Sequence, residues 1–183
     1  AQNAFLRRDL AEHRDQRTFI FFHHPVSEYA TAYAAPPVVF GVRPDRGGVE
    51  FLDLMARYPN VVGVFNAHTH RNFVSYSPRT GARLPYIESG AAKEYPGGYS
   101  IVRVYSGGYS RNFYRPRNCE FCRDWTATTR SEYLGLYPYY TLGTLDARNF
   151  THVYGCPIPT PPPSPPGNAG VGGGAIANRA CTS

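Results

Sequence analysis

The stretch that decides the fold is Val61-Val-Gly-Val-Phe-Asn-Ala-His-Thr-His-Arg-Asn72, in which a valine-rich run ends in two histidines one residue apart. Its apolar part, Val61 to Phe65, has the length and β-branched content of a buried strand. His68 and His70 follow on the loop beyond the carboxyl end, where open α/β sheets usually bind ligands. Neutral imidazole is a good ligand for zinc, iron and manganese. Alone the pair is weak evidence, because His-x-His also arises by chance on surfaces.

A second apolar run strengthens this interpretation. Thr18 to Phe22 has the character of another short strand, and it too ends in histidines, His23 and His24. The apolar spacing between the two runs predicts a helix over Gly48 to Tyr58. A strand–helix–strand crossover makes the two strands parallel, with their carboxyl ends on the same side of the sheet. The histidines of both runs are therefore expected to converge.

These motifs resemble those of a known family. Phe22-His23-His24-Pro25 after one strand, and Ala67-His68-Thr69-His70-Arg71-Asn72 after the next, resemble the second half of the calcineurin-like metallophosphoesterases over Gln2 to Pro116. Ala67 stands where the family usually has glycine. The family's first motifs, Asp-x-His, Gly-Asp-x-x-Asp and Gly-Asn-His-Asp or Glu, are absent from the sequence. The resemblance implies an α/β fold, half of a β-sandwich flanked by helices (αββα), with the amino-terminal half supplied in cis or in trans.

The resemblance also implies a chemistry. His23 and His68 would hold one divalent ion and His70 the other, in a dinuclear site for manganese, iron or zinc that activates water to hydrolyse a phosphate ester. Arg71 and Asn72 are candidates for phosphate binding or loop positioning, His24 is expected either to face the substrate or to pack, and no catalytic residue is assigned. With three neutral ligands and no bridging carboxylate, we expect the chain alone to bind metal weakly and hydrolyse little. The residues themselves also allow a pocket without metal.

After the second motif the pattern becomes antiparallel. Paired strands are expected over Asn72–Tyr76 with Arg83–Glu88, and over Tyr99–Tyr105 with Tyr109–Tyr114. Glu88 is interpreted either as a hydrogen-bond partner of a ligating histidine or as a solvated carboxylate at a strand end. A helix over Gln2–Arg14 precedes the first strand. The chain is thus divided into residues 1–116, a Cys-containing extension over 117–155, and a Pro/Gly-rich tail over 156–183.

Four cysteines suggest disulfides formed in an oxidising compartment, hence a secreted, periplasmic or extracellular protein. Cys119 and Cys122 form a Cys-x-x-Cys motif, and Cys156 and Cys181 are the others, which leaves three possible connectivities. A thioredoxin-like role lacks its usual βαβ setting, and a structural zinc site lacks a second nearby pair. Asn149 begins a glycosylation sequon, which is also a common chance match.

The composition restricts the partners. The formal charge is +6, and Lys93 is the only lysine among 19 basic residues. No long basic run with interleaved aromatics indicates nucleic-acid binding. No apolar run approaches the roughly 20 residues that span a membrane. A second class of function stays open, namely a secreted structural or interaction module with a vestigial metal site, in which the tyrosine-rich surface and the proline-rich tail would matter.

Overall fold

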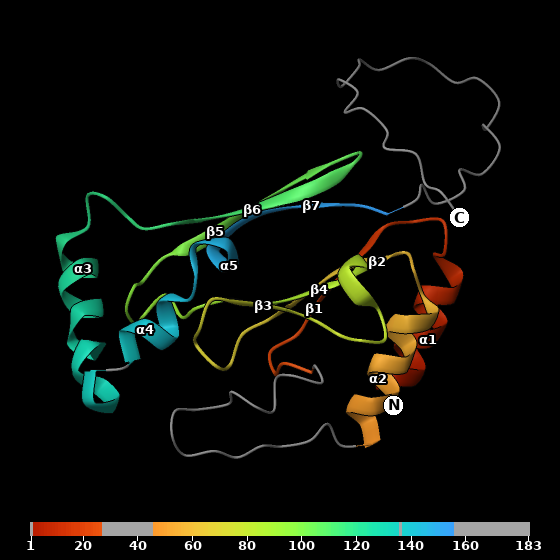
Figure 1. Ribbon diagram of the computed structural model, residues 1–183, viewed down its shortest axis with the longest axis horizontal. Helices are drawn as coiled ribbons and strands as arrows, with labels where there is room; N and C mark the ends of the chain where they lie inside the picture. The colour runs from red at the N-terminus through yellow and green to blue at the C-terminus, as the bar shows by residue number, and fades with distance from the viewer. Residues whose placement is uncertain (1, 27–45, 136, 156–183) are drawn as a thin grey trace.

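The computed structural model describes residues 2–26, 46–135 and 137–155. Within these ranges the chain is a mixed α/β fold with one four-stranded and one three-stranded sheet (Figure 1). Residues 27–45, between the two histidine-bearing strands, and the Pro/Gly-rich tail from residue 156 on lie outside the described residues.

The four-stranded sheet carries both histidine motifs. Its strands are β1 (Thr18–Phe21), β2 (Val61–Asn66), β3 (Phe73–Tyr76) and β4 (Pro85–Glu88), in the spatial order β1-β2-β4-β3. β1, β2 and β4 run parallel to their neighbours, whereas β3 pairs antiparallel to β4. The predicted parallel pairing of the two histidine-bearing strands is confirmed, as is the antiparallel return after them. All of β2 is buried, which explains its nearly unbroken apolar sequence.

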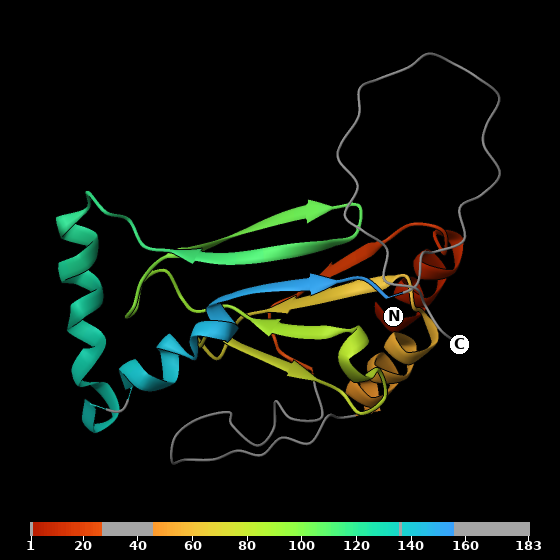
Figure 2. The same cartoon turned by 45° about the horizontal axis from the view of Figure 1, so that its top comes forward.

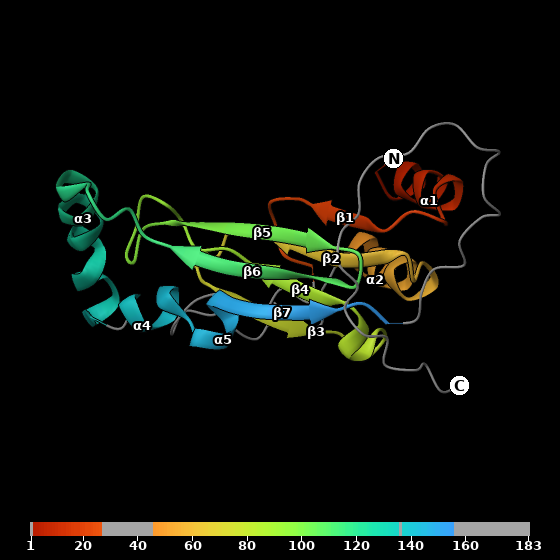
Figure 3. The same ribbon diagram turned by 90° about the horizontal axis from the view of Figure 1, so that it is seen from above.

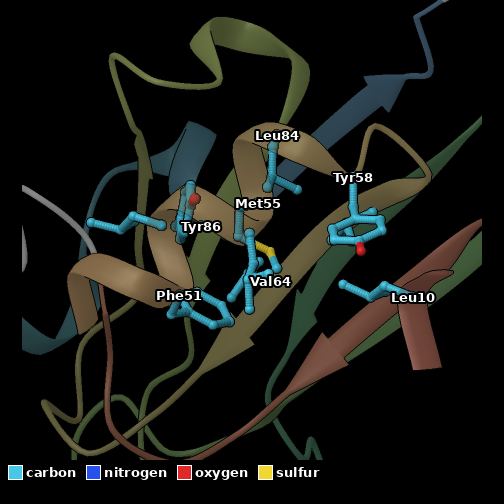
Figure 4. Packing of buried hydrophobic residues seen from close by; sticks show 10 residues of the cluster. Leu10, Phe51, Met55, Tyr58, Val64, Leu84 and Tyr86 are labelled. Atoms are coloured by element: carbon cyan, nitrogen blue, oxygen red, sulfur yellow. The ribbon is translucent and has the colours of Figure 1, made fainter. Parts of the chain in front are cut away.

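Two helices cover one face of this sheet. They are α1 (Gln2–Glu12) and α2 (Arg46–Arg57), close to the predicted ranges. Phe51, Leu52 and Met55 of α2 recur at helical spacing, and all three are buried against the sheet together with Val64 of β2 (Figure 4). Each such side chain contributes roughly 1.5–3 kcal/mol when it leaves water. This apolar layer fixes the position of β1 and β2, and hence of the loops that follow them.

The second sheet covers the opposite face. It consists of β5 (Tyr99–Tyr105), β6 (Gly108–Tyr114) and β7 (Asn149–Val153), all antiparallel (Figure 2). The β5–β6 hairpin was predicted. β7 was not, and it lies within the expected extension over 117–155, which therefore supplies one strand of the sandwich. The layer between the sheets contains Val62, Phe65, Ile87, Tyr109 and Tyr154.

The remaining elements lie at the end of the sheets away from α1 and α2 (Figure 1). They are α3 (Glu120–Ala127), a 3-10 segment over Thr128–Gly135, α4 (Tyr137–Leu142) and α5 (Leu145–Arg148). A further 3-10 turn, Gly81–Arg83, precedes β4. None of the helices in the described ranges has the length and apolar character that crossing a membrane requires.

Within the described residues, both sheets have an unpaired edge on the same side of the molecule. β1 is an edge strand of one sheet and β5 of the other, and Figure 3 shows the two strands along the same side. Phe21 on β1 is 70% exposed and Val104 on β5 is 58% exposed. Large apolar side chains on open strand edges are a template for pairing with further chain.

Candidate metal centre

Three imidazoles meet beyond the carboxyl ends of β1 and β2. The Ala67 amide donates a hydrogen bond of 3.0 Å to the carbonyl of His23, which joins the two loops directly after the strands. His68 Nδ1 lies 3.3 Å from His23 Nε2. One nitrogen from each of His23, His24 and His68 lies within 4.8 Å of the others, and all three side chains are exposed. The structure thus brings His23 and His68 together and adds His24, which the family resemblance assigned to substrate.

One pair of these nitrogens, which are within hydrogen-bond distance of each other without metal, has a spacing compatible with a shared metal ion. Zinc binds imidazole nitrogen at about 2.0–2.1 Å in tetrahedral sites, so two such ligands lie about 3.3–3.4 Å apart. The separation of 3.3 Å between His68 Nδ1 and His23 Nε2 falls in that range. Within the described residues, no cysteine or carboxylate joins the three histidines. The donor set is therefore neutral and incomplete, which suits a transition metal that takes further ligands from elsewhere.

The loop that carries His68 and His70 has an unusual backbone. Both residues adopt left-handed conformations, with φ of 63° and 58°. The Thr69 amide donates to the Ala67 carbonyl at 2.7 Å, which closes a tight turn centred on His68. Non-glycine residues in this region are uncommon and cost about 1–2 kcal/mol each. Such strain persists only where the surroundings fix it, and it concentrates at functional sites.

A buried ion pair supplies that support. Arg71 Nε and Nη2 donate to the two carboxylate oxygens of Glu88 at 2.7 and 2.8 Å. The hydroxyl of Thr69 donates to the same carboxylate at 2.5 Å. Glu88 is only 2% exposed because it ends β4, opposite Asn66 of β2 and Phe73 of β3. Both interpretations of Glu88 from the sequence were therefore wrong. It neither contacts a histidine nor faces solvent, but holds the loop through Thr69 and Arg71.

Arg71 and Asn72 are placed inside the protein. Arg71 is 4% exposed, and its guanidinium also lies over the Phe73 ring, 4.1 Å from the centroid. Asn72 is 1% exposed, donates from Nδ2 to the Thr141 carbonyl at 3.1 Å, and accepts from Arg111 at 3.0 Å. Of the two roles considered for Arg71 and Asn72, the structure favours loop positioning over substrate contact.

Gly143 allows the close approach of this loop to the chain after α4. Its φ is +65°, and a β-carbon there would lie 1.9 Å from the carbonyl oxygen of Asn72. Only glycine fits both the conformation and the contact.

His70 is not one of the three clustered histidines, and it has a partner that the sequence analysis missed. His70 Nδ1 lies 2.7 Å from Glu94 Oε2, and Glu94 is buried. With Nδ1 as the donor, Nε2 is the basic nitrogen, which is the arrangement of most metal-ligating histidines. Glu94 is the only carboxylate in the small-residue loop between β4 and β5, and this was the one signal that could have identified it.

The electrostatic environment of His68 favours its neutral form. Partial burial lowers the pKa of His68 below its ordinary value, and the neighbouring His24, His23 and His70 lower it further, in that order. These neighbours disfavour a proton on His68 because like charges repel. Neutral imidazole has a free lone pair for a metal ion, so the lowered pKa of His68 favours its role as a ligand.

The other candidate residues lie away from the histidines. Cys119 and Cys122 form a disulfide, whereas Cys156 and Cys181 lie outside the described residues. Asn149 begins β7, is half-buried, and accepts a hydrogen bond of 3.1 Å from the Phe113 amide through Oδ1. Glycosylation of Asn149 stays a prediction.

Comparison with known proteins adds no assignment to this geometry. No family model matches the sequence, and no curated protein is significantly similar to it. The site geometry and the two histidine motifs are therefore the basis for assigning a function.

Proposed function

We propose that this chain contributes the histidine half of a divalent-metal site in a metallophosphoesterase, a hydrolase of phosphate esters. The observation that carries the proposal is the convergence of His23, His24 and His68 beyond two adjacent parallel strands, with ligand nitrogens within 4.8 Å of one another. The order of the motifs resembles that of the calcineurin-like family, in which a metal pair performs this reaction. A bound divalent ion supplies a water nucleophile that is active at neutral pH and stabilises charge on phosphoryl oxygens.

The chain's own residues orient the ligands for that role. His23 and His68 share the position that the resemblance gives to one ion. His70, held by Glu94 through Nδ1, has Nε2 as the nitrogen for a second ion. Glu88 fixes the turn between His68 and His70 through Thr69. The metal-binding nitrogens are therefore preorganised by contacts from β4 and the loop after it, although the imidazoles themselves are exposed.

We propose that the missing ligands come from a segment that pairs along the open edges of β1 and β5, in cis or in trans. A hollow of about 530 Å³ opens between the sheets beside His23, with apolar walls that include Phe21, Phe65 and Val102. A strand added at either edge would cover these side chains and bring its own residues to the histidines. Carboxylates on that segment would supply the negative charge of the site, because the cluster of His23, His24 and His68 contains no carboxylate.

Titration calorimetry of the chain with zinc or manganese tests the proposal. We expect weak binding of one ion, and a loss of affinity of roughly tenfold or more in His68→Ala. His13→Ala is the matched control, because His13 is a surface histidine on the turn after α1, hydrogen-bonded to Asp9, and should leave binding unchanged. Equal binding by the wild type and His68→Ala would refute the site. Tight binding of two ions by this chain would refute its incompleteness.

Hydrolysis is tested separately with a chromogenic phosphate ester. Weak activity that disappears in His68→Ala but not in His13→Ala supports the hydrolase. Activity that is unchanged by His68→Ala would refute the hydrolase function. The alternative, a non-catalytic interaction module, would then be favoured. The exposed aromatic and apolar side chains along β5, including Tyr99 and Val104, are the surface that such a module would use.

A further inference from the structure

A second reactive group lies away from the histidines, at the start of α3. Cys119 and Cys122 are joined by a disulfide and are separated by only two residues. Both line a cavity of about 380 Å³ whose other walls include Pro96, Tyr99 and Pro116. A disulfide buried in a packed core is inert, whereas this one faces a cavity open to solvent. Its sulfurs are therefore accessible to a thiol from another molecule.

The surroundings of Cys119 favour negative charge on its sulfur. Cys119 is the residue before the first turn of α3, and its Sγ accepts a hydrogen bond of 3.0 Å from the Cys122 amide. Three arginines, Arg115, Arg117 and Arg123, line the same cavity. The acidic residues of α3, Glu120 and Asp124, are not among the lining residues. Hydrogen-bond donors, cations and the amino-terminal end of a helix all stabilise a thiolate.

Two exposed aromatic side chains lie beside this disulfide. Phe121 is 75% exposed and Trp125 is 57% exposed, and their rings stack with centroids 6.1 Å apart. Phe121 lies between the two cysteines in sequence. Exposed aromatics next to an apolar cavity are suited to an extended peptide with apolar side chains, because such contacts bury area at little entropic cost.

We infer that Cys119 and Cys122 form a thiol–disulfide exchange site that oxidises cysteine pairs in apolar peptide segments. A peptide thiolate attacks Cys119 Sγ, the Cys119–Cys122 bond breaks, and Cys122 leaves as a thiolate that takes up a proton. A second peptide thiolate then attacks the peptide sulfur of the mixed disulfide and expels Cys119 as a thiolate. Two electrons pass from the peptide dithiol to the protein, so the peptide gains the disulfide that the protein loses. This activity is independent of the proposed metal centre.

The stabilised Cys119 thiolate is what would make this exchange favourable. A leaving group that carries its negative charge easily departs faster, and a stabilised reduced form makes the protein disulfide the stronger oxidant. The reduced protein returns to its starting form by exchange with another disulfide, for example oxidised glutathione.

The experiment is a redox titration of the full chain carrying Cys156→Ser and Cys181→Ser, so that Cys119 and Cys122 are the only cysteines. Mixtures of reduced and oxidised glutathione set the redox potential of the solution. Alkylation followed by mass spectrometry counts the free thiols. Trp125, the sole tryptophan and three residues after Cys122, provides a fluorescence signal for the same transition. We expect reversible reduction by millimolar glutathione, with far-ultraviolet circular dichroism unchanged. A pair that resists glutathione, or whose reduction unfolds the chain, would show that the disulfide is structural.

Two further measurements test the mechanism. In the reduced protein, iodoacetamide should modify Cys119 at least about tenfold faster than Cys122 at neutral pH, because the Cys119 sulfur precedes the first turn of α3 and accepts a hydrogen bond from the Cys122 amide. Substitution of Arg115, Arg117 and Arg123 by glutamine should reduce that ratio. Equal rates for the two cysteines would contradict the assignment of Cys119 as the attacked sulfur.

Peptide oxidation is measured with a synthetic dithiol peptide that has two cysteines flanked by leucines. The oxidised protein should convert it to the disulfide form in one stoichiometric turnover. When Cys122→Ser is mixed with the oxidised peptide, the Cys119 thiolate should attack the peptide disulfide and form a mixed disulfide, with one peptide sulfur leaving as a thiolate. Joint replacement of Phe121 and Trp125 by serine should slow the reaction with this peptide but leave the reaction with glutathione unchanged. No oxidation of the peptide by the wild type would overturn the inference.

Discussion

The exposed histidine cluster and the ion pair beneath it form opposite environments at the same edge of one sheet. His23, His24 and His68 are exposed, whereas Glu88 and Arg71 are 2% and 4% exposed. The imidazoles contact one another, with ring centroids 4.3 to 5.2 Å apart, and they follow directly after β1 and β2. The ion pair has bidentate geometry and also binds the loop that carries His68. The comparison indicates that the histidines supply the candidate ligand atoms, whereas Glu88 and Arg71 stabilise the loop that positions them. Substitutions in the two groups should therefore have different effects on metal affinity and on stability.

The largest effect is expected for Glu88→Gln. The substitution removes the charge but keeps the shape, so the guanidinium of Arg71 stays buried without its counter-charge. Breaking a buried pair in this way costs about 3–5 kcal/mol of unfolding free energy. Urea denaturation monitored by circular dichroism measures it. The matched control is Asp53→Asn, which breaks the exposed Arg79–Asp53 pair and should cost less than about 1 kcal/mol. Similar losses in the two variants would show that the buried pair does not support the loop.

The same comparison explains which features the sequence could predict. The strands of the first sheet and the helices α1 and α2 follow from apolar periodicity, because one face or the whole of each element is buried. The meeting of His23 and His68 follows from a parallel crossover, which is a rule of topology. These features depend on patterns within about 50 residues of chain. They need no knowledge of particular side-chain partners.

The features that sequence analysis missed depend on partners distant in the chain. Glu88 was expected at a strand end in solvent or beside a histidine. It is buried instead, because β4 pairs with β3 on one side and with β2 on the other. Glu94 is hydrogen-bonded to His70, which lies 24 positions earlier, and Glu94 is in a loop whose sequence has no periodic pattern. β7 is five residues long and half polar, so that its pairing with β6 decides its structure. Tertiary contacts of this kind leave no periodic pattern in the sequence.

A smaller effect is expected where the loop is strained. His68 has φ of 63°, a conformation that glycine adopts freely and alanine does not. His68→Gly should therefore be more stable than His68→Ala by about 1 kcal/mol, although both lose the same imidazole. Both variants should lose metal affinity equally in titration calorimetry. Equal stability of the two variants would mean that the turn relaxes once the side chain is removed, and that the support from Glu88 does not hold its backbone.

The smallest effect concerns a buried imidazole outside the site. His152 on β7 is 9% exposed and packs against Tyr109 and Tyr154, with ring centroids 5.3 and 6.3 Å away. Burial lowers its pKa, and a backbone hydrogen bond with Arg83 opposes this only in part. In the unfolded chain the pKa returns to about 6.5. Between the two values the unfolded state binds more protons than the folded state.

The free energy of unfolding should therefore fall as the pH drops below about 6.5 towards the lowered pKa of folded His152. Above pH 6.5 the contribution is complete, because both states are neutral. Urea denaturation of the wild type and His152→Phe, from about pH 7.5 to about pH 5, measures the difference in slope, and the variant should have the shallower one. The lowered pKa of His68 acts in the same direction, but its exposed ring makes that contribution smaller. Hence His68→Gly should change the pH dependence of the unfolding free energy less than His152→Phe does. The reverse order would show that the main acid-sensitive group lies in the histidine cluster and not between the sheets.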